Sequence, residues 1–263
     1  MISSDDRLAT DLAAEAGHRL LTLRARGGDP TALRQAGDQS SHEFLTAELA
    51  RRRPGDAVLS EEGADDPARL AARRVWIVDP LDGTREFGEP GRTDWAVHVA
   101  LWEAGRLTAG AVALPAQGQV LSTADPSASP PAPPPGTLRL VVSRTRPAAF
   151  IPRLADKIGA EVVPLGSAGA KAAAVIRGDA EVYVHDGGQY EWDSAAPVAV
   201  ARAAGLHTSR IDGSDLRYNQ ANPSVPDILI CPIELAATLL GAIDRSRSAQ
   251  PAGLTGPGRT TTQ

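Results

Sequence analysis

Leucine and alanine recur every three or four residues between Leu8 and Leu23, and a pair of glycines follows this segment. The spacing places the apolar residues on one face of a helix that ends at the glycines. A second helix is predicted over residues 40–53, where a Pro-Gly pair ends it. The chain therefore opens with two helices.

Short runs of β-branched and aromatic residues, each bounded by turn residues, follow the predicted helices. They predict strands near 57–60, 74–79, 94–102, 107–114 and 119–122. Residues 96–101 alternate partly between apolar and polar side chains, and residues 103–106 read as a hairpin turn. We expect an antiparallel block that completes an α+β half over residues 1–124.

Residues 125–137 are rich in proline and predict a linker or surface loop. Beyond it, residues 138–245 alternate strands with helices, which predicts an α/β half. The strands are expected near 138–143, 161–164, 181–184 and 228–231, and the helices near 147–158, 168–177, 193–204 and 233–245. Residues 246–263 are polar and aperiodic, so a disordered tail is predicted.

Composition indicates a soluble enzyme rather than a binder of nucleic-acid polymers, because the formal charge is −5 and the pI is about 5.6. The first residues lack the features of a secretory leader, and no apolar run is long enough for a bilayer. We therefore expect a cytoplasmic protein without a membrane partner. One cysteine excludes an intrachain disulfide.

Two carboxylates, Asp79 and Asp82, follow the apolar run 75–78 directly. Pro80 is expected to stop the strand there. An unpaired buried carboxylate is costly, and a divalent cation removes that cost. The segment therefore predicts either a hard-cation site or a turn in which Asp79 caps backbone N–H groups and Gly83 supplies a positive φ.

Two further acidic segments lie elsewhere, at residues 60–62 and 191–193. Glu61, the run Asp-Pro-Leu-Asp-Gly-Thr at 79–84 and the run Trp-Asp-Ser-Ala-Ala at 192–196 occur in this order. In order and spacing this set resembles the inositol monophosphatase superfamily over roughly residues 5–245 of this chain.

The resemblance implies a layered α-β-α-β-α sandwich and a Mg²⁺-dependent, lithium-sensitive phosphatase with two or three ions. It implies metal binding by Glu61, Asp79, Asp82 and Asp193 and by the backbone carbonyl of Leu81. It implies catalytic roles for Thr84, Asp38 and Glu61, in which Thr84 and Asp38 help to activate the attacking water. It also implies a small phosphate-ester substrate and, as in many relatives, a homodimer.

Asp38 has a second interpretation, since residues 40–43 look like the capping start of a helix and Asp38 then stands at its entry. Asp193 can likewise cap a helix that starts near Ser194, a role compatible with metal binding.

Hard oxygen ligands suit Mg²⁺, and two such ions together activate water and stabilise a leaving alkoxide without a protein nucleophile. The one cysteine, Cys231, lies in an apolar run and is interpreted as core rather than as a catalytic thiol. Five scattered histidines show no spacing typical of metal ligands.

Three segments resemble the CysQ-type branch of the superfamily, which removes the 3′-phosphate of 3′-phosphoadenosine 5′-phosphate. They are Arg-Glu-Phe at 85–87, Val-Ser-Arg-Thr-Arg at 142–146 and the glycine-rich run 166–171. The resemblance implies substrate contacts from Asp82, Gly83, Thr84, Ser143, Arg144, Lys171 and Asp193. As alternatives, residues 142–146 form a solvated loop, and Lys171 lies at an ordinary helix start.

Three departures leave the substrate open. The proline-rich loop stands where relatives often have a longer hairpin, His98 stands where such relatives tend to have asparagine, and residues 187–191 have no close counterpart. Trp192 is interpreted as core rather than as a platform for adenine. The alternatives are an inositol monophosphatase or fructose bisphosphatase with the same mechanism, broad specificity among these substrates, and a non-catalytic protein that senses ions or nucleotides.

Overall fold

The structure is a computed structural model that describes residues 4–125 and 136–248. It opens with two long helices, α1 (Ser4–Ala25) and α2 (Pro30–Arg52). The prediction that the second helix starts at residue 40 was wrong, because α2 begins ten residues earlier. Asp29 caps it by accepting hydrogen bonds from the backbone N–H groups of Thr31 and Ala32, and Pro30 occupies the first helical position. Asp38 therefore lies inside α2 and not at its entry.

The first sheet contains β1 (Ala57–Ser60), β2 (Arg74–Asp82), β3 (Ala96–Glu103), β4 (Arg106–Leu114) and β5 (Gln119–Ser122), in this spatial order. The expectation of a purely antiparallel block was wrong at one edge, because β1 runs parallel to β2. The chain returns between them through a crossover that contains the 3₁₀ helix η1 (Pro67–Ala71). The other three pairs are antiparallel, as predicted.

The second sheet has the order β7-β6-β8-β10-β9. Its strands are β6 (Leu138–Ser143), β7 (Ala160–Leu165), β8 (Val182–Tyr190), β9 (His207–Ser209) and β10 (Ser224–Cys231). β8 is longer than predicted because Gly187 and Gly188, both with positive φ, form a bulge and the strand continues beyond them. The short strand β9 was not predicted.

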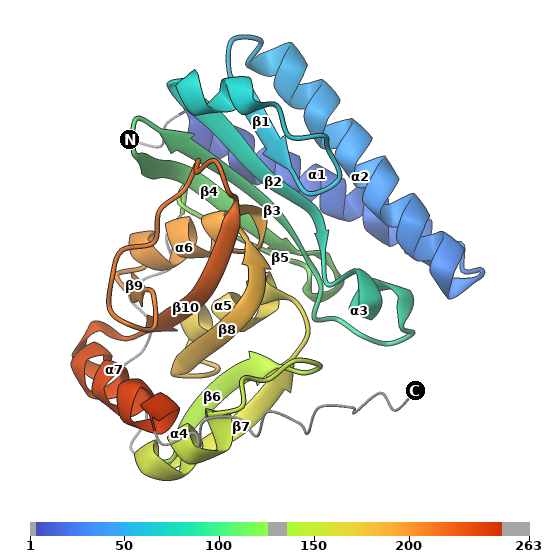
Figure 1. The fold of residues 1–263 in the computed structure, drawn as a ribbon. Helices are drawn as coiled ribbons and strands as arrows, with labels where there is room; N and C mark the ends of the chain where they lie inside the picture. The colour runs from blue at the N-terminus through green and yellow to red at the C-terminus, as the bar shows by residue number, and fades with distance from the viewer. Residues whose placement is uncertain (1–3, 126–135, 249–263) are drawn as a thin grey trace, which may run out of the picture.

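The remaining helices are α3 (Thr84–Gly88), α4 (Ile151–Ile158), α5 (Ala168–Arg177), α6 (Glu191–Ala203) and α7 (Ile233–Ser248), and η2 (Pro115–Gln117) is a second 3₁₀ turn. Helices α1 and α2 cover one face of the first sheet, α5 and α6 lie between the two sheets, and α4 and α7 cover the outer face of the second (Figure 1). The layered α-β-α-β-α architecture is confirmed.

The sequence of β2 is almost continuously apolar because both faces of the strand are buried. Val75 and Ile77 pack into the core between the two sheets, whereas Trp76 and Val78 pack against α1 and α2. Both faces of the strand are buried, so polar alternation is absent. The first polar side chain after this run, Asp79, consequently emerges inside the protein at 1% exposure.

The proline-rich stretch 126–135 and residues 249–263 lie outside the described residues, so the linker and the division into two halves stay predictions. The tail was predicted to start at residue 246, but α7 continues to Ser248, and only residues 249–263 of that prediction stay untested. None of the helices within residues 4–125 and 136–248 combines the length and hydropathy that a bilayer crossing needs.

Candidate active site

The acidic end of β2 is shaped by a bulge. Asp79 pairs with His98 of β3 and Asp82 pairs with Ala96, so Pro80 and Leu81 face a single residue of the partner strand. The strand was predicted to end at Pro80. Instead, its pairing with β3 is interrupted there and resumes at Asp82. Through this bulge β2 delivers two carboxylates at its tip.

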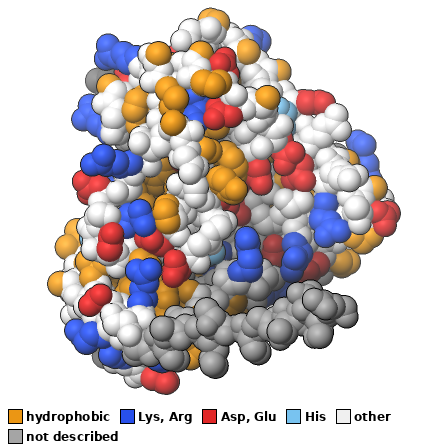
Figure 2. Space-filling model, in the orientation of Figure 1, with side chains coloured by type: hydrophobic (Ala, Val, Ile, Leu, Met, Phe, Trp, Pro, Cys, Tyr) orange, Lys and Arg blue, Asp and Glu red, His pale blue; other side chains and the backbone are white. Residues whose placement is uncertain are grey.

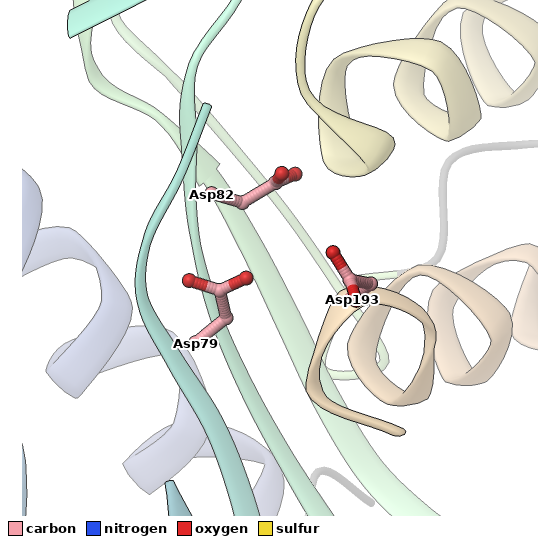
Figure 3. A group of neighbouring side chains, drawn as sticks. All are labelled: Asp79, Asp82 and Asp193. Atoms are coloured by element: carbon pink, nitrogen blue, oxygen red, sulfur yellow. The ribbon is translucent and has the colours of Figure 1, made fainter. Parts of the chain in front are cut away.

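A third carboxylate, Asp193, reaches the same point from the first turn of α6. One oxygen from each of Asp79, Asp82 and Asp193 lies within 4.8 Å of the others, and Figure 3 shows the three side chains converging. The prediction that α6 starts near Ser194 was wrong by three residues. Asp193 is the third helical residue, and its Oδ2 accepts a hydrogen bond from the backbone N–H of Tyr190 at 2.7 Å, which closes the start of the helix.

Glu61 follows β1, and its backbone N–H donates to the carbonyl oxygen of Val78 on β2. Its side chain lines the same cavity and lies close enough to the carboxyl of Asp79 to shift the pKa of both groups. The parallel pairing of β1 with β2 thus brings a fourth carboxyl to the cluster.

Electrostatics in the cluster are dominated by burial and mutual repulsion. Burial and the charge of Asp193 raise the pKa of Glu61 to about 7, and burial and the charge of Asp82 raise the pKa of Asp193 to about 6. The pKa of Asp79 is also raised well above its usual value, by burial and by Glu61. Burial and the closeness of like charges therefore raise the pKa of all three carboxyls.

The pKa of Asp82 shifts in the opposite direction. Burial raises its pKa, but the imidazole of His98 and the ammonium of Lys171 lower it more, so the net shift is downward. Its Oδ2 accepts hydrogen bonds from Ser167 Oγ at 2.6 Å and from the backbone N–H of Gly169 at 2.7 Å. His98 Nε2 lies 3.2 Å from the same oxygen, without forming a hydrogen bond of good geometry. Asp82 is therefore held by the N-terminus of α5, where the helix dipole favours negative charge.

The donor set fits a hard divalent cation. The cluster offers carboxylate oxygens from Glu61, Asp79, Asp82 and Asp193, and oxygen ligands of this kind suit Mg²⁺, Mn²⁺ or Ca²⁺. A bound cation would also relieve the repulsion that raises three of the four pKa values.

Asp38 and Thr84 meet beside the cluster. The Thr84 hydroxyl lies 3.3 Å from Asp38 Oδ1 and 3.0 Å from the carbonyl oxygen of Leu81, and its one proton can be donated to either. Asp38 approaches from α2 and Thr84 opens α3, after Gly83 turns the chain with a φ of +83°. This geometry favours the interpretation of Asp38 as the partner of Thr84 over its interpretation as a residue at the entry of a helix.

The titration of Asp38 gives a testable pH dependence. Burial and the nearby charge of Glu62 raise the pKa of Asp38 to about 7. Because only the carboxylate accepts a proton, we expect kcat/KM to fall as pH drops through about 7, and Asp38→Asn to lower kcat and flatten that limb.

The free energy of unfolding should depend on pH in the opposite direction to activity, decreasing as pH rises. The folded protein holds the Asp38 proton up to about pH 7, whereas the unfolded chain releases it near its usual pKa, so folding becomes less favourable as pH rises between the two. Asp38→Asn should therefore melt no lower than the wild type at pH 8. A variant that is fully active at pH 8, or less stable there, would contradict these roles.

The acidic cluster lies in the wall of a cavity of about 510 Å³. Of the residues predicted to contact substrate, the cavity is lined by Asp82, Gly83, Thr84, Ser143, Lys171 and Asp193. Arg144 is not brought there. Its guanidinium pairs with Glu86 and lies 3.2 Å from Glu89, two acids in and just after α3.

Lys171 lies in the first turn of α5, and its side chain is only 3% exposed, so it is not the solvated lysine of an ordinary helix start. Its ammonium donates hydrogen bonds to the carbonyl oxygens of Gly166 and Ser167. Burial lowers its pKa to about 8, against the opposing charges of Asp82 and Asp193. The lysine therefore balances part of the cluster's negative charge.

Several supporting residues were not recognised from the sequence. Ser167 and Gly169 donate hydrogen bonds to Asp82, and His98 lies 3.2 Å from it. Asp94 Oδ2 accepts a 2.7 Å hydrogen bond from the backbone N–H of Gly166. In the sequence, the run of small residues 166–170 was the signal that could have indicated Ser167 and Gly169. A polar histidine in the apolar alternation of residues 96–101 was the signal for His98.

Burial also bears on the interpretations of Cys231 and Trp192. Cys231 is buried among core residues, which raises its thiol pKa to about 12 and excludes a thiolate nucleophile. Trp192 packs partly buried against the core between the sheets and stacks on Tyr190.

The chain matches the model of the inositol monophosphatase family over residues 6–127 and 136–246. A relative from Mycobacterium bovis described as 3′-phosphoadenosine 5′-phosphate phosphatase is 55% identical over 238 residues, which cover 87% of this chain and 89% of the relative. The 3′(2′),5′-bisphosphate nucleotidase CysQ of Escherichia coli is 31% identical, with coverage of 70% and 78%. The crystal structure of CysQ from Bacteroides thetaiotaomicron superposes with a TM-score of 0.77 at 26% identity, covering 87% of this chain and 97% of that one.

Proposed function

The chain belongs to the inositol monophosphatase family, and from this membership we propose that it is a Mg²⁺-dependent phosphatase that converts 3′-phosphoadenosine 5′-phosphate to AMP and phosphate. The observation that carries the proposal is the acidic cluster with the Asp38–Thr84 pair beside it, in a cavity of nucleotide size. The substrate follows from the name of the 55% identical relative. As the resemblance to the CysQ-type branch implies, this reaction would serve sulfur assimilation by clearing an inhibitory by-product.

Glu61, Asp79, Asp82, Asp193 and the carbonyl of Leu81 would hold the metal ions. When bound, Mg²⁺ supplies charge neutralisation of the phosphate and a lowered pKa for coordinated water. These groups lie at the tip of β2, directly after β1 and in the first turn of α6. We expect Li⁺, another small cation that prefers oxygen ligands, to inhibit.

Thr84 and Asp38 position and deprotonate the attacking water. In the form that supports attack, the Thr84 hydroxyl donates to the Asp38 carboxylate, so its lone pairs can accept a hydrogen bond from water. As water gives a proton to Thr84 Oγ, the Thr84 proton passes to the Asp38 carboxylate, which becomes a neutral acid while the attacking oxygen carries the negative charge. No side chain of the protein needs to form a covalent intermediate.

Two sequence predictions about the cell stay predictions, namely the cytoplasmic location and the homodimer. The structure contributes only the absence of a bilayer-crossing helix among the described elements.

The proposed substrate is tested by phosphate release with Mg²⁺ from 3′-phosphoadenosine 5′-phosphate, inositol monophosphate and fructose 1,6-bisphosphate under one set of conditions. We expect kcat/KM for the nucleotide to exceed both others by about tenfold or more, which is about 1.4 kcal/mol of transition-state discrimination. A flat profile, or one that favours inositol monophosphate, would keep the metal chemistry and overturn the substrate. No release from any substrate would favour the non-catalytic alternative.

A further inference from the structure

Arg69, in the 3₁₀ helix η1, is an arginine buried in the protein interior. Charged side chains of both signs are interspersed over the face of the molecule drawn in Figure 2, where they meet solvent. Arg69, by contrast, is 1% exposed. A guanidinium is always charged in a protein, so its burial is stable only when its donors are bound. The partners of Arg69 therefore show which parts of the fold it holds together.

Two contacts of Arg69 lie within the crossover between β1 and β2. Its Nε and Nη2 donate to the two carboxylate oxygens of Asp65 at 2.6 and 3.0 Å, which makes a bidentate pair. Asp65 comes four residues after Glu61, the carboxylate that lines the cavity directly after β1. The pair thus fixes the far end of the segment that begins at Glu61.

The other contacts of Arg69 reach the segment before β10. Its Nη1 donates to Asn219 Oδ1 at 2.8 Å, and its Nη2 donates to the carbonyl oxygen of Gln220 at 2.9 Å. Asn219 Nδ2 donates in return to the carbonyl oxygen of Arg69 at 3.2 Å. The crossover in the first sheet is therefore joined to a segment 150 residues further along the chain.

Glu191, the first residue of α6, is bound by the same segment. Its Oε2 accepts a hydrogen bond from the backbone N–H of Asn219 at 2.7 Å, and its Oε1 accepts one from that of Gln220 at 2.8 Å. Its own backbone N–H donates to the carbonyl oxygen of Pro223 at 2.8 Å. Asp193 follows in the same helical turn. The contacts that fix the buried Glu191 thus also fix the start of the helix from which Asp193 reaches the acidic cluster.

Asn219 connects the two sides of this arrangement. Its φ of +58° lies in the left-handed region, which asparagine adopts more readily than most residues. In this conformation its amide side chain contacts Arg69, while its backbone N–H and the next one both donate to Glu191. Arg69, Asn219 and Glu191 together form a buried unit, here called the Arg69 network, between the segment after Glu61 and the start of α6.

We propose that the Arg69 network is a positioning device for the metal site, which holds Glu61 and Asp193 at the separation that a divalent cation requires. Glu61 follows a strand of the first sheet, whereas Asp193 follows a strand of the second, and their charges repel each other. A network that keeps the two ligands in place before the ion arrives reduces the rearrangement needed on binding. This inference rests on the proposed function only in that the acidic cluster binds Mg²⁺, and it does not depend on which phosphate ester is the substrate.

The test is a calorimetric Mg²⁺ titration of purified, metal-free Glu191→Gln beside the wild type. The amide accepts only one of the two backbone hydrogen bonds, because its NH₂ opposes the other N–H. We expect the Mg²⁺ concentration at half-saturation to rise by about tenfold or more, as is typical for residues that support metal ligands. Turnover at saturating Mg²⁺ should stay close to that of the wild type, because the ligands themselves are unchanged.

Glu181→Gln is the matched control. Glu181 is also buried, at 3% exposure, and its carboxylate accepts from the backbone N–H of Arg139 at 2.6 Å and pairs with the Arg139 guanidinium. It lies just before β8, whereas the cavity is lined by Gly188 and Gln189 near the other end of that strand. We expect Glu181→Gln to lower Tm as Glu191→Gln does and to leave Mg²⁺ affinity unchanged.

Asn219→Gly is a milder second variant of the network. Glycine keeps the positive φ and both backbone N–H groups, but the contact with Arg69 is lost. We expect a smaller rise in the Mg²⁺ concentration at half-saturation than in Glu191→Gln. This variant supplies the test if Glu191→Gln does not fold.

The outcomes separate this inference from the proposed function. A wild type that binds Mg²⁺ and releases phosphate, with unchanged Mg²⁺ affinity in every folded variant of the network, would overturn the positioning role and leave the function standing. Equal losses of affinity in Glu191→Gln and Glu181→Gln would also overturn it, since the effect would then be one of general stability. A wild type that does not bind Mg²⁺ would overturn the metal mechanism together with this inference.

Discussion

Asp82→Asn should lower kcat by about 10³-fold or more, a loss of about 4 kcal/mol of transition-state stabilisation. One oxygen of Asp82 accepts from Ser167 and from the backbone of Gly169, and the carboxylate lies with Asp79 and Asp193 around the metal position. An amide cannot satisfy both sides. If the NH₂ of the new amide faces the donors Ser167 and Gly169, donors oppose donors, and if it faces the cation, a metal ligand is lost. In both orientations the negative charge of the ligand is lost.

The measurement is phosphate release at saturating substrate, together with a calorimetric Mg²⁺ titration of the purified protein. We expect weaker Mg²⁺ binding as well as slower turnover. Asp156→Asn, an exposed position in α4, is the matched control and should match the wild type in both. Near-normal turnover of Asp82→Asn would refute a metal mechanism at this cluster.

Gly169→Ala should destabilise the fold by about 2 to 3 kcal/mol, the cost typical of overpacking a core. A Cβ there would lie 2.3 Å from His98 Nε2 and 2.9 Å from the Cβ of Ala96. His98 cannot retreat easily, because it is fully buried and its Nδ1 lies 3.0 Å from the carbonyl oxygen of Trp192. The strain falls on the turn of α5 that holds Asp82, so we also expect reduced activity.

Thermal unfolding with and without Mg²⁺ measures this effect. For a chain of this size each kcal/mol corresponds to about 2–4 °C in Tm, so a fall of about 4–12 °C is expected. Gly55→Ala is the control, since no atom lies within 4 Å of a Cβ there and the change should stay within about 0.5 kcal/mol. Equal Tm values for the two variants would contradict this prediction. They would mean that α5 can move away from the first sheet without loss of stability.

The metal ligands and most helices and strands were predictable because they depend on local signals. An apolar run followed by Asp-x-x-Asp-Gly is visible in the sequence, and its resemblance to a known family extends to Glu61 and Asp193. The contacts that position those ligands depend instead on long-range packing. No local pattern joins Asp82 to Ser167 or to His98, because α5 reaches the first sheet only after the chain has built part of the second.

The errors at element ends have similar causes. The start of α2 was misplaced because the residues at 40–43 resemble a cap, whereas the capping residue that is used, Asp29, precedes a proline. The position of Arg144 outside the cavity was equally beyond the sequence, because it depends on pairing with Glu86 and Glu89, which come from another part of the fold.

The burial of β2 on both faces has a consequence for amide hydrogen exchange. Because this strand is covered by α2 on one side and by α6 on the other, local fraying cannot expose its central amides. Protons at Ile77 and Val78 should therefore exchange only when the whole molecule unfolds. Their exchange rates with and without Mg²⁺ would report how far metal binding stabilises the entire fold.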